Sequence, residues 1–175
     1  AFYGPKLDFI AHDSIGRKHQ VATIQLDRNL PERFDLTCVN ENGEKERVVM
    51  IHAAIAGSLE RFSAVLIEHL AGNFPLRIAP TQIAIIPVAE VHNEYATEVH
   101  NKLTAAGFRT EIDTSSDSMG KKVRNAKKDR LPYFVIIGDK DIEANTVTVE
   151  SRDTEESEAM SIEELLTKLT AETSV

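Results

Sequence analysis

The sequence predicts an α/β protein built from two small domains. An α+β part with an antiparallel sheet and one long helix is expected first, and an α/β part with a mixed, mainly parallel sheet follows it. Short turns join the strand-like segments before residue 52, which excludes parallel crossovers there. After residue 80, buried strands alternate with helical patterns. We place the division between residues 1–76 and residues 77–175.

The first domain is expected to contain four strands and one helix. The strands are residues 7–11, 18–26, 33–39 and 46–51. The turn before the fourth strand ends in Asn42-Gly43, which tolerates positive φ. The helix is expected over residues 53–71, because apolar side chains from Ile55 to Leu70 recur every three or four residues. Gly72 then ends it.

The second domain is expected to alternate strands with helices. The strands are residues 82–88, 108–112, 133–137 and 145–150. The helices are residues 93–106 and 119–130, with a last one from Ser161, where Glu164 completes a capping box. Alternation with short links predicts a mainly parallel sheet.

The net charge of −8 is unevenly distributed. Residues 139–175 hold 11 acids and 3 bases, so this segment alone carries −8 and the first 138 residues balance. Residues 119–131 hold six bases and one acid. This basic helix is either an ordinary solvated face or a phosphate-binding surface, since phosphate contacts act within a Debye length of about 8–10 Å. No apolar stretch approaches the roughly 20 residues that span a bilayer, so no membrane is expected.

Cys38 is the single cysteine of the chain, which excludes a disulfide within it and fits a reducing cytosol. It lies in the alternating segment 34–39, so a buried structural thiol is expected.

Four blocks of the sequence carry a family resemblance. They are AFYGPKLDF at residues 1–9, QVATIQLD at 20–27, MIH at 50–52 with GSLERF at 57–62, and MGKKVR at 119–124 with Gly138-Asp139-Lys140. In this order they resemble bacterial-type threonyl-tRNA synthetases over nearly the whole chain. The resemblance implies the last third of a class II catalytic domain, including motif 3, followed by an anticodon-binding domain.

The resemblance implies an ATP site in the first domain. Arg61 of motif 3 is expected to grip the γ-phosphate of ATP, with Ser58 one helical turn before it, because a guanidinium fork suits phosphate oxygens. Without the motif, a surface arginine paired with a glutamate is the alternative. The family also uses Gln20 and Thr23 near ATP and Gln25 near the amino acid. An odd separation places Gln20 and Gln25 on opposite faces of a regular strand, unless a bulge or twist intervenes.

The resemblance also implies a zinc ion that binds the amino and hydroxyl groups of threonine, which separates threonine from valine. His52 matches one zinc ligand, although a lone histidine is more often structural. The other two family ligands are expected upstream of Ala1, so we expect weak or no zinc binding by this chain. Tyr3 and Lys6 match residues that line the threonine and adenylate pocket, and a half-buried strand aromatic is the alternative for Tyr3.

Six residues of the second domain match family positions near the anticodon or on the basic helix. They are Ser116, Lys121, Lys122, Arg124, Arg130 and Asp141. RNA loops offer splayed bases and phosphates to such side chains. The sequence departs from the usual family residues at Ser116 (Asn), Glu150 (Arg), Ala53 (Arg) and Val21 (Cys).

The expected function is that of a threonine–tRNA ligase. ATP with Mg²⁺ activates threonine, which is then transferred to tRNA(Thr), in a cytoplasmic enzyme that is a homodimer at full length. Two alternatives stay open at this point: a tRNA-binding module without chemistry, and another class II synthetase such as the prolyl enzyme.

Class II motifs 1 and 2 are absent from the sequence, and motif 2 supplies the arginine that holds the α-phosphate. We therefore expect the 175-residue chain alone to give no threonine-dependent ATP–pyrophosphate exchange. Exchange above a no-threonine blank, with purified chain, would refute this expectation.

Overall fold

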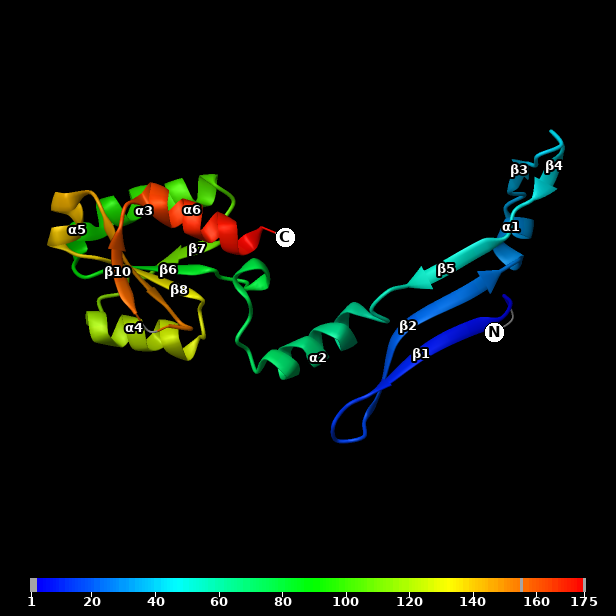
Figure 1. Cartoon of the computed structure of the whole chain (residues 1–175), viewed down its shortest axis with the longest axis horizontal. Helices are drawn as coiled ribbons and strands as arrows, with labels where there is room; N and C mark the ends of the chain where they lie inside the picture. The colour runs from blue at the N-terminus through cyan, green and yellow to red at the C-terminus, as the bar shows by residue number, and fades with distance from the viewer. Residues whose placement is uncertain (1–2, 155, 175) are drawn as a thin grey trace. The chain divides into compact units, whose positions relative to one another are not determined.

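The computed structural model describes residues 3–154 and 156–174. The chain divides into two compact units, the first ending at His69 and the second beginning at Leu70 (Figure 1). The α/β class is confirmed, with antiparallel sheets in the first unit and a mixed sheet in the second. None of the described helices is long and apolar enough to cross a membrane.

The first unit is built on a three-stranded antiparallel sheet in the order β1–β2–β5. These strands are Lys6–His12, Lys18–Asp27 and Met50–Ala54. A short helix, α1, and a two-stranded ribbon, β3–β4, lie between β2 and β5, and the helix α2 follows β5. Their bounds are Asn29–Arg33 for α1, Thr37–Val39 for β3, Lys45–Arg47 for β4 and Leu59–Leu70 for α2.

Two predicted elements of this unit begin later than the sequence indicates. The strand expected over residues 33–39 is reduced to β3, because α1 extends to Arg33. The helix expected from residue 53 begins at Leu59, because Ala53 and Ala54 still pair with β2. The predicted strand 46–51 is split, since β4 pairs with β3 whereas β5 pairs with β2.

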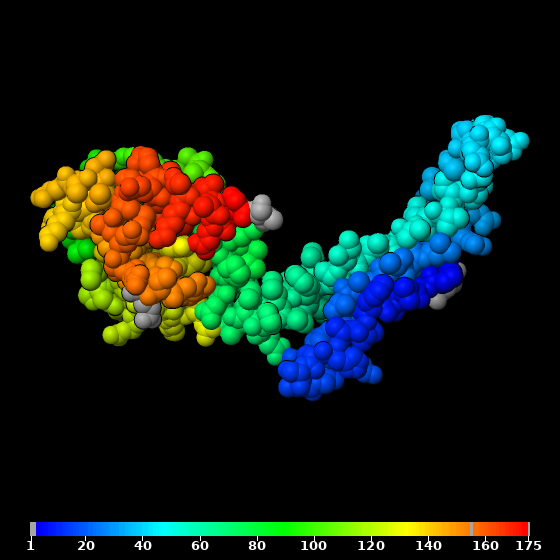
Figure 2. Space-filling view, viewed as in Figure 1, coloured from blue at the N-terminus to red at the C-terminus, as the bar shows by residue number. Residues whose placement is uncertain are grey.

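Cys38 is exposed, so the prediction of a buried thiol is wrong. It lies on β3 opposite Glu46, and its Sγ donates to the Glu46 carboxylate at 3.9 Å. The apolar side chains beside it do not form a core: Phe34 is 69% exposed and Val39 is 67% exposed. Figure 2 shows the ribbon in cyan, with its side chains at the surface of the unit.

The second unit is a five-stranded mixed sheet in the order β10–β9–β8–β6–β7. The strands are β6 Ile83–Pro87, β7 Thr110–Ile112, β8 Tyr133–Ile137, β9 Val147–Ser151 and β10 Ser157–Met160. The helices are α3 Asn93–Ala105, α4 Met119–Lys128, α5 Asp139–Ala144 and α6 Ile162–Thr173, with 3₁₀ turns η1 Leu76–Ile78 and η2 Glu90–His92. Pairing is parallel between β6 and both β7 and β8, and antiparallel across β8–β9–β10. The sequence analysis missed α5 and β10.

Side chains alternate across this sheet and pack against helices on both faces. Ile83 and Ile85 of β6 belong to the core cluster that holds Val99 and Leu103 of α3, together with apolar residues of α6. Ala84 and its neighbours on the other face pack against α4. Accordingly, α3 and α6 lie on one side of the sheet and α4 on the other (Figure 1). This three-layer arrangement gives the second unit a closed hydrophobic core.

Three side chains of the second unit hold its segment 74–80 in place. The Arg152 guanidinium donates to the Phe74 carbonyl at 3.1 Å, and the Gln82 amide donates to the Leu76 carbonyl at 2.8 Å. Arg109 donates to the Arg77 carbonyl at 2.9 Å and also to the carbonyls of Ala79 and Pro80. These contacts order the segment that leads into β6.

Replacing Leu103 with alanine should destabilise the second unit by about 2–5 kcal/mol, because the side chain is fully buried and the cavity left behind collapses only in part. The free energy of unfolding in urea measures this loss. The matched control is Val91→Ala, which also shortens an apolar side chain, at a residue of the second unit that is 78% exposed. Equal losses in the two variants would contradict the assignment of the core.

Candidate functional site

A β-bulge in β2 determines which side chains of the first unit share a face. Phe9 pairs with Ala22, whereas the next residue of β1, Ile10, pairs with Gln20, so Val21 is an extra residue in β2. The extra residue cancels one step of the alternation. Gln20 therefore lies on the same face as Thr23, and its amide donates to the Thr23 hydroxyl at 2.8 Å. The opposite-face arrangement expected of a regular strand does not hold, and the reason is the bulge.

This face of the sheet carries a row of polar side chains, and we call it the polar face. Cross-strand partners share a face, and Gln25 pairs with both Lys6 and His52, while Thr23 pairs with Asp8. The polar side chains of this face are Lys6, Asp8, Gln20, Thr23, Gln25, Asp27 and His52, and the register places Ile10, Met50 and Ala54 on the same face. The opposite face carries exposed apolar side chains, including Leu7 and Ile24.

Asp8 organises the centre of the polar face. Its carboxylate accepts a hydrogen bond from the Gln20 amide at 2.9 Å and another from the Thr23 hydroxyl, and it forms an ion pair with Lys6 at 2.8 Å. The hydrogen bonds from Lys6 and then Thr23 hold the pKa of Asp8 below its usual value, against the opposing effect of burial. Asp8 is therefore ionised at neutral pH and fixes the direction of the Gln20 and Thr23 side chains.

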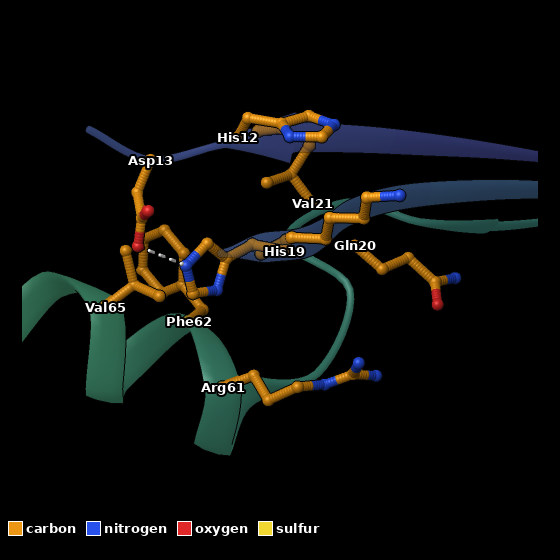
Figure 3. A pocket seen from close by; sticks show the side chains of 11 residues that line it. His12, Asp13, His19, Gln20, Val21, Arg61, Phe62 and Val65 are labelled. Atoms are coloured by element: carbon orange, nitrogen blue, oxygen red, sulfur yellow. Dashed lines mark hydrogen bonds and ion pairs between the residues drawn. The ribbon is translucent and has the colours of Figure 1, made fainter. Parts of the chain in front are cut away.

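Arg61 lies beside Gln20 in one cavity. The cavity has a volume of about 370 Å³, and its lining includes Gln20 from β2 and both Arg61 and Phe62 from α2. Figure 3 shows the Gln20 and Arg61 side chains extending in the same direction from these two elements. The Arg61 backbone N–H and its Nε each donate to the Ser58 hydroxyl at 3.3 Å. Thr23 is connected to this cavity through its hydrogen bond with Gln20, and Gln25 lies two residues further along the polar face.

The Arg61 side chain is accessible, and no carboxylate of the described residues neutralises its charge. Within residues 3–154 and 156–174, no carboxylate forms an ion pair with it, so the alternative of a glutamate-paired surface arginine finds no support. A guanidinium without an anionic partner, next to an amide and a hydroxyl, is suited to bind phosphate oxygens.

The turn before α2 holds Arg61 against the bulge. Ala56 and Gly57 both have positive φ, 88° and 69°, and the Ala56 N–H donates to the Val21 carbonyl at 3.0 Å. A Cβ added at Gly57 would collide with the Gln20 carbonyl oxygen. Glycine is therefore required twice at this position, for its backbone conformation and for the close approach.

A charged cluster ties α2 to the β1–β2 turn. The Asp13 carboxylate accepts from the Arg17 Nε at 2.6 Å and contacts the His19 Nε2 at 3.1 Å, and Arg17 also pairs with Glu68 of α2 at 2.8 Å. Burial raises the pKa of Asp13, but the hydrogen bonds from His19 and Arg17 outweigh this and leave that pKa well below its usual value. Asp13 is thus an anion that fixes one wall of the cavity.

The remaining predicted residues of this unit lie at the other end of the sheet. The Tyr3 carbonyl accepts from the Arg28 N–H at 3.2 Å, just before β1. His52 lies in the middle of β5. The helix expected directly after it begins only at Leu59. The His52 Nε2 is 2.8 Å from the Asp27 Oδ2. Among the described residues there is no group of three or more potential metal ligands, so His52 offers a metal ion a single donor from this chain.

The sequence analysis missed Asp27, which is only 1% exposed. Its Oδ1 accepts from the backbone N–H groups of Asn29 and Leu30, at 2.8 and 3.0 Å, so the same carboxylate starts α1 and contacts His52. Two signals were available in the sequence. Asp27 follows Gln25 at a spacing of two on a strand, and it precedes Pro31, a residue that the first turn of a helix tolerates.

In the second unit, the basic helix α4 has one face turned outward and one turned inward. Arg124 and Lys128 are exposed, Lys121 pairs with Asp117 at 2.9 Å, and Lys127 pairs with Glu150 at 2.6 Å. Lys122 is buried instead of exposed: its Nζ donates to the carbonyls of Pro87 at 3.3 Å and Asp113 at 2.9 Å. It therefore joins the carboxyl ends of β6 and β7 rather than extending from the outer face of the helix.

The other predicted residues of this unit are only partly brought together. Ser116 is exposed and lines a cavity of about 390 Å³ with Lys122. Asp141 is buried, and its carboxylate accepts from the Gly138 N–H at 2.9 Å and from the Thr148 hydroxyl at 2.8 Å, so it caps α5. Arg130 follows α4 with φ 58°, and its side chain lies next to Gly72. Neither Asp141 nor Arg130 lines the Ser116 cavity.

Two family models match the chain. Residues 1–70 match the tRNA synthetase class II core domain (G, H, P, S and T), and residues 82–172 match the anticodon binding domain. The threonine–tRNA ligase of Deinococcus deserti is 55% identical over 155 residues, which is 89% of this chain and 24% of that protein. The ligase of Deinococcus radiodurans is 49% identical over 97% of this chain and 26% of its own length. The chain thus spans about a quarter of the curated relatives that it matches.

A solved structure is also similar. It is the RNA binding domain of threonyl-tRNA synthetase from Cryptosporidium parvum Iowa II, with a TM-score of 0.84 and 37% sequence identity. The match covers 98% of this chain and 44% of that one.

Replacing Gly57 with alanine should detach the turn before α2 from the bulge, because the added methyl group meets the Gln20 carbonyl. Hydrogen exchange at the Ala56 amide, which donates to the Val21 carbonyl, measures this, and its protection should fall. Gly43→Ala is the matched control, since Gly43 also has a left-handed φ, 81°, but open space around it. Unchanged protection in Gly57→Ala, or an equal loss in both variants, would contradict the close approach.

Proposed function

Because the chain belongs to the class II tRNA synthetases that carry an anticodon-binding domain, we propose that it forms the C-terminal part of a threonine–tRNA ligase. In this proposal, residues 1–76 are the C-terminal part of the catalytic domain and residues 77–175 are the anticodon-binding domain. The full-length enzyme activates threonine with ATP and Mg²⁺, transfers it to tRNA(Thr), is a homodimer and acts in the cytoplasm.

One observation supports the catalytic half of the proposal most strongly. The bulge at Val21 places Gln20 on the polar face with Thr23, and the Gly57 turn brings Arg61 into the cavity beside Gln20. The result is a cation with which no carboxylate of the described residues pairs, next to a row of hydrogen-bonding side chains. Activating an amino acid with ATP requires charge neutralisation and positioning more than acid–base chemistry, and these groups supply both.

We assign roles to the residues from their positions. Arg61, held by Ser58, neutralises the γ-phosphate of ATP, while Gln20 and Thr23, held by Asp8, hydrogen-bond the nucleotide. Gln25 faces the amino acid from the same face.

Lys6 and Tyr3 lie at the end of the sheet where β1 begins, and we place them in the wall of the threonine and adenylate pocket. Zinc, when bound, would polarise the amino and hydroxyl groups of threonine. His52 would supply one nitrogen to it, and the further ligands would come from outside the described residues.

In the second unit, the exposed bases of α4 would contact tRNA phosphates, and Ser116 would face an anticodon base at the carboxyl ends of β6 and β7. Lys122 and Asp141 are buried and would support the RNA surface without contacting RNA. Lys122 holds the loop that carries Ser116, and Asp141 caps the start of α5. Arg130 would extend the basic surface beyond α4.

Binding of tRNA(Thr) to the 175-residue chain tests this half of the proposal. Affinity should fall steeply with salt, and Arg124→Ala or Lys128→Ala should each weaken binding and reduce the salt slope by about 1. Filter binding at several salt concentrations measures both quantities.

The matched control is Lys168→Ala, which removes an exposed lysine from α6 on the other side of the sheet. Binding that does not respond to salt, or an equal loss in the control, would refute the assignment of the RNA surface.

A further inference from the structure

The loop between β6 and α3 forms one wall of the Ser116 cavity. Val88, Ala89, Glu90 and Asn93 line the cavity from this loop, and residues 114–117 line it from the loop after β7. The two strands are parallel neighbours, and the chain leaves β6 for a helix on one face of the sheet and β7 for a helix on the other. A crevice between two such loops is where open α/β sheets bind ligands.

His92 fastens this wall to the start of α5. The residue is buried, with only 3% of its surface exposed. Its Nδ1 accepts from the Ala89 N–H at 3.0 Å, and its Nε2 lies 2.9 Å from Oδ1 of Asp139, whose side chain is 86% exposed. The Val88 N–H also donates to the Ile137 carbonyl at 2.9 Å. The loop after β6 is thus held against both the end of β8 and the start of α5.

Both ring nitrogens of His92 are used, which fixes the tautomer and the orientation of the ring. A nitrogen that accepts from an N–H group carries no proton, so the proton of the ring is on Nε2 and is donated to the Asp139 carboxylate. Turning the ring would break both hydrogen bonds, and a buried polar group that loses its partner costs stability. The backbone on either side of His92 is therefore held in one place.

Asn93 follows His92 directly and begins α3. Its side chain is half-buried and lines the cavity, and its amide forms no hydrogen bond with another group of the described residues. An amide offers both donors and an acceptor, and bases splayed out of an RNA loop present complementary groups on their edges. The cavity therefore offers a base the Asn93 amide as well as the Ser116 hydroxyl.

We propose that Asn93 contacts the same anticodon base as Ser116, and that His92 is the positioning residue that holds Asn93 at the cavity. The inference rests on the proposed function, which supplies the RNA. The wall and its buried histidine are features of this chain.

The test is filter binding of the 175-residue chain to tRNA(Thr) and to three versions of that tRNA, each with one anticodon base replaced. Asn93→Ala should lower the preference for tRNA(Thr) about fivefold or more at one anticodon position and leave the other two unchanged, because the amide contacts one base. Asn101→Ala is the matched control, since it makes the same change on the same helix at an exposed residue that does not line the cavity. Unchanged preference at all three positions, an equal fall at all three, or the same effect in Asn101→Ala would overturn the proposal.

His92→Gln tests the positioning role. Glutamine can still donate toward Asp139, but it leaves the Ala89 N–H without the acceptor at Nδ1, so the preference should fall at the same anticodon position as in Asn93→Ala. Because His92 acts through Asn93, a double variant with both changes should show the preference of Asn93→Ala alone. Losses that add in the double variant, or a fall at a different anticodon position, would contradict this role.

Nitrogen NMR of the histidine-labelled wild type tests the same role even if His92→Gln does not fold. Above the pH range in which imidazole is protonated, His92 should be the Nε2–H tautomer, and an Nδ1–H tautomer would overturn its positioning role. A wild-type chain that does not bind tRNA(Thr), or that binds all four RNAs equally, would refute the proposed function and this inference with it. A chain that prefers tRNA(Thr) but does not respond to Asn93→Ala would refute this inference alone.

Discussion

The bulge at Val21 is the feature on which the candidate site depends. A regular strand would turn Gln20 away from Thr23 and Gln25, and only the extra residue aligns all three with Asp8 and His52 on one face. The same bulge offers the Val21 carbonyl to the Ala56 N–H, which fixes the turn that carries Arg61. One local irregularity in β2 therefore determines which side chains line the polar face and where Arg61 lies.

The two units are stabilised in different ways. The second unit buries a continuous core on both faces of its sheet, so removal of apolar surface from water dominates its stability. In the first unit, among the described residues, only Asp27 and Pro31 are buried. Its order rests on strand pairing and on polar contacts, such as those of Asp8 and Asp13. The residues proposed to bind ligands thus also hold their own unit together.

Most elements follow from local patterns in the sequence, and the misses follow from long-range pairing. Periodicity locates β1, β2, β6 and β8, because each repeats a simple apolar pattern. The late start of α2 combines both kinds of signal: β2 draws Ala53 and Ala54 into β5, and Ser58 caps the helix by accepting from the Arg61 N–H, a local signal that the sequence analysis did not use. In the sequence, Lys122 cannot be distinguished from the five other bases of residues 119–131. Only the fold shows that its Nζ binds carbonyls at the ends of two strands. Asp27 was overlooked because its partner lies 25 residues away.

The central claim is that Arg61 and Gln20 form one site for a nucleotide. It is tested most directly by titrating the chain with ATP and Mg²⁺ while following the Gln20 side-chain amide and the Arg61 Nε–H by NMR. The account predicts that both signals shift along a single saturation curve. Shifts at Arg61 without Gln20, separate curves for the two groups, or no response at either would contradict it.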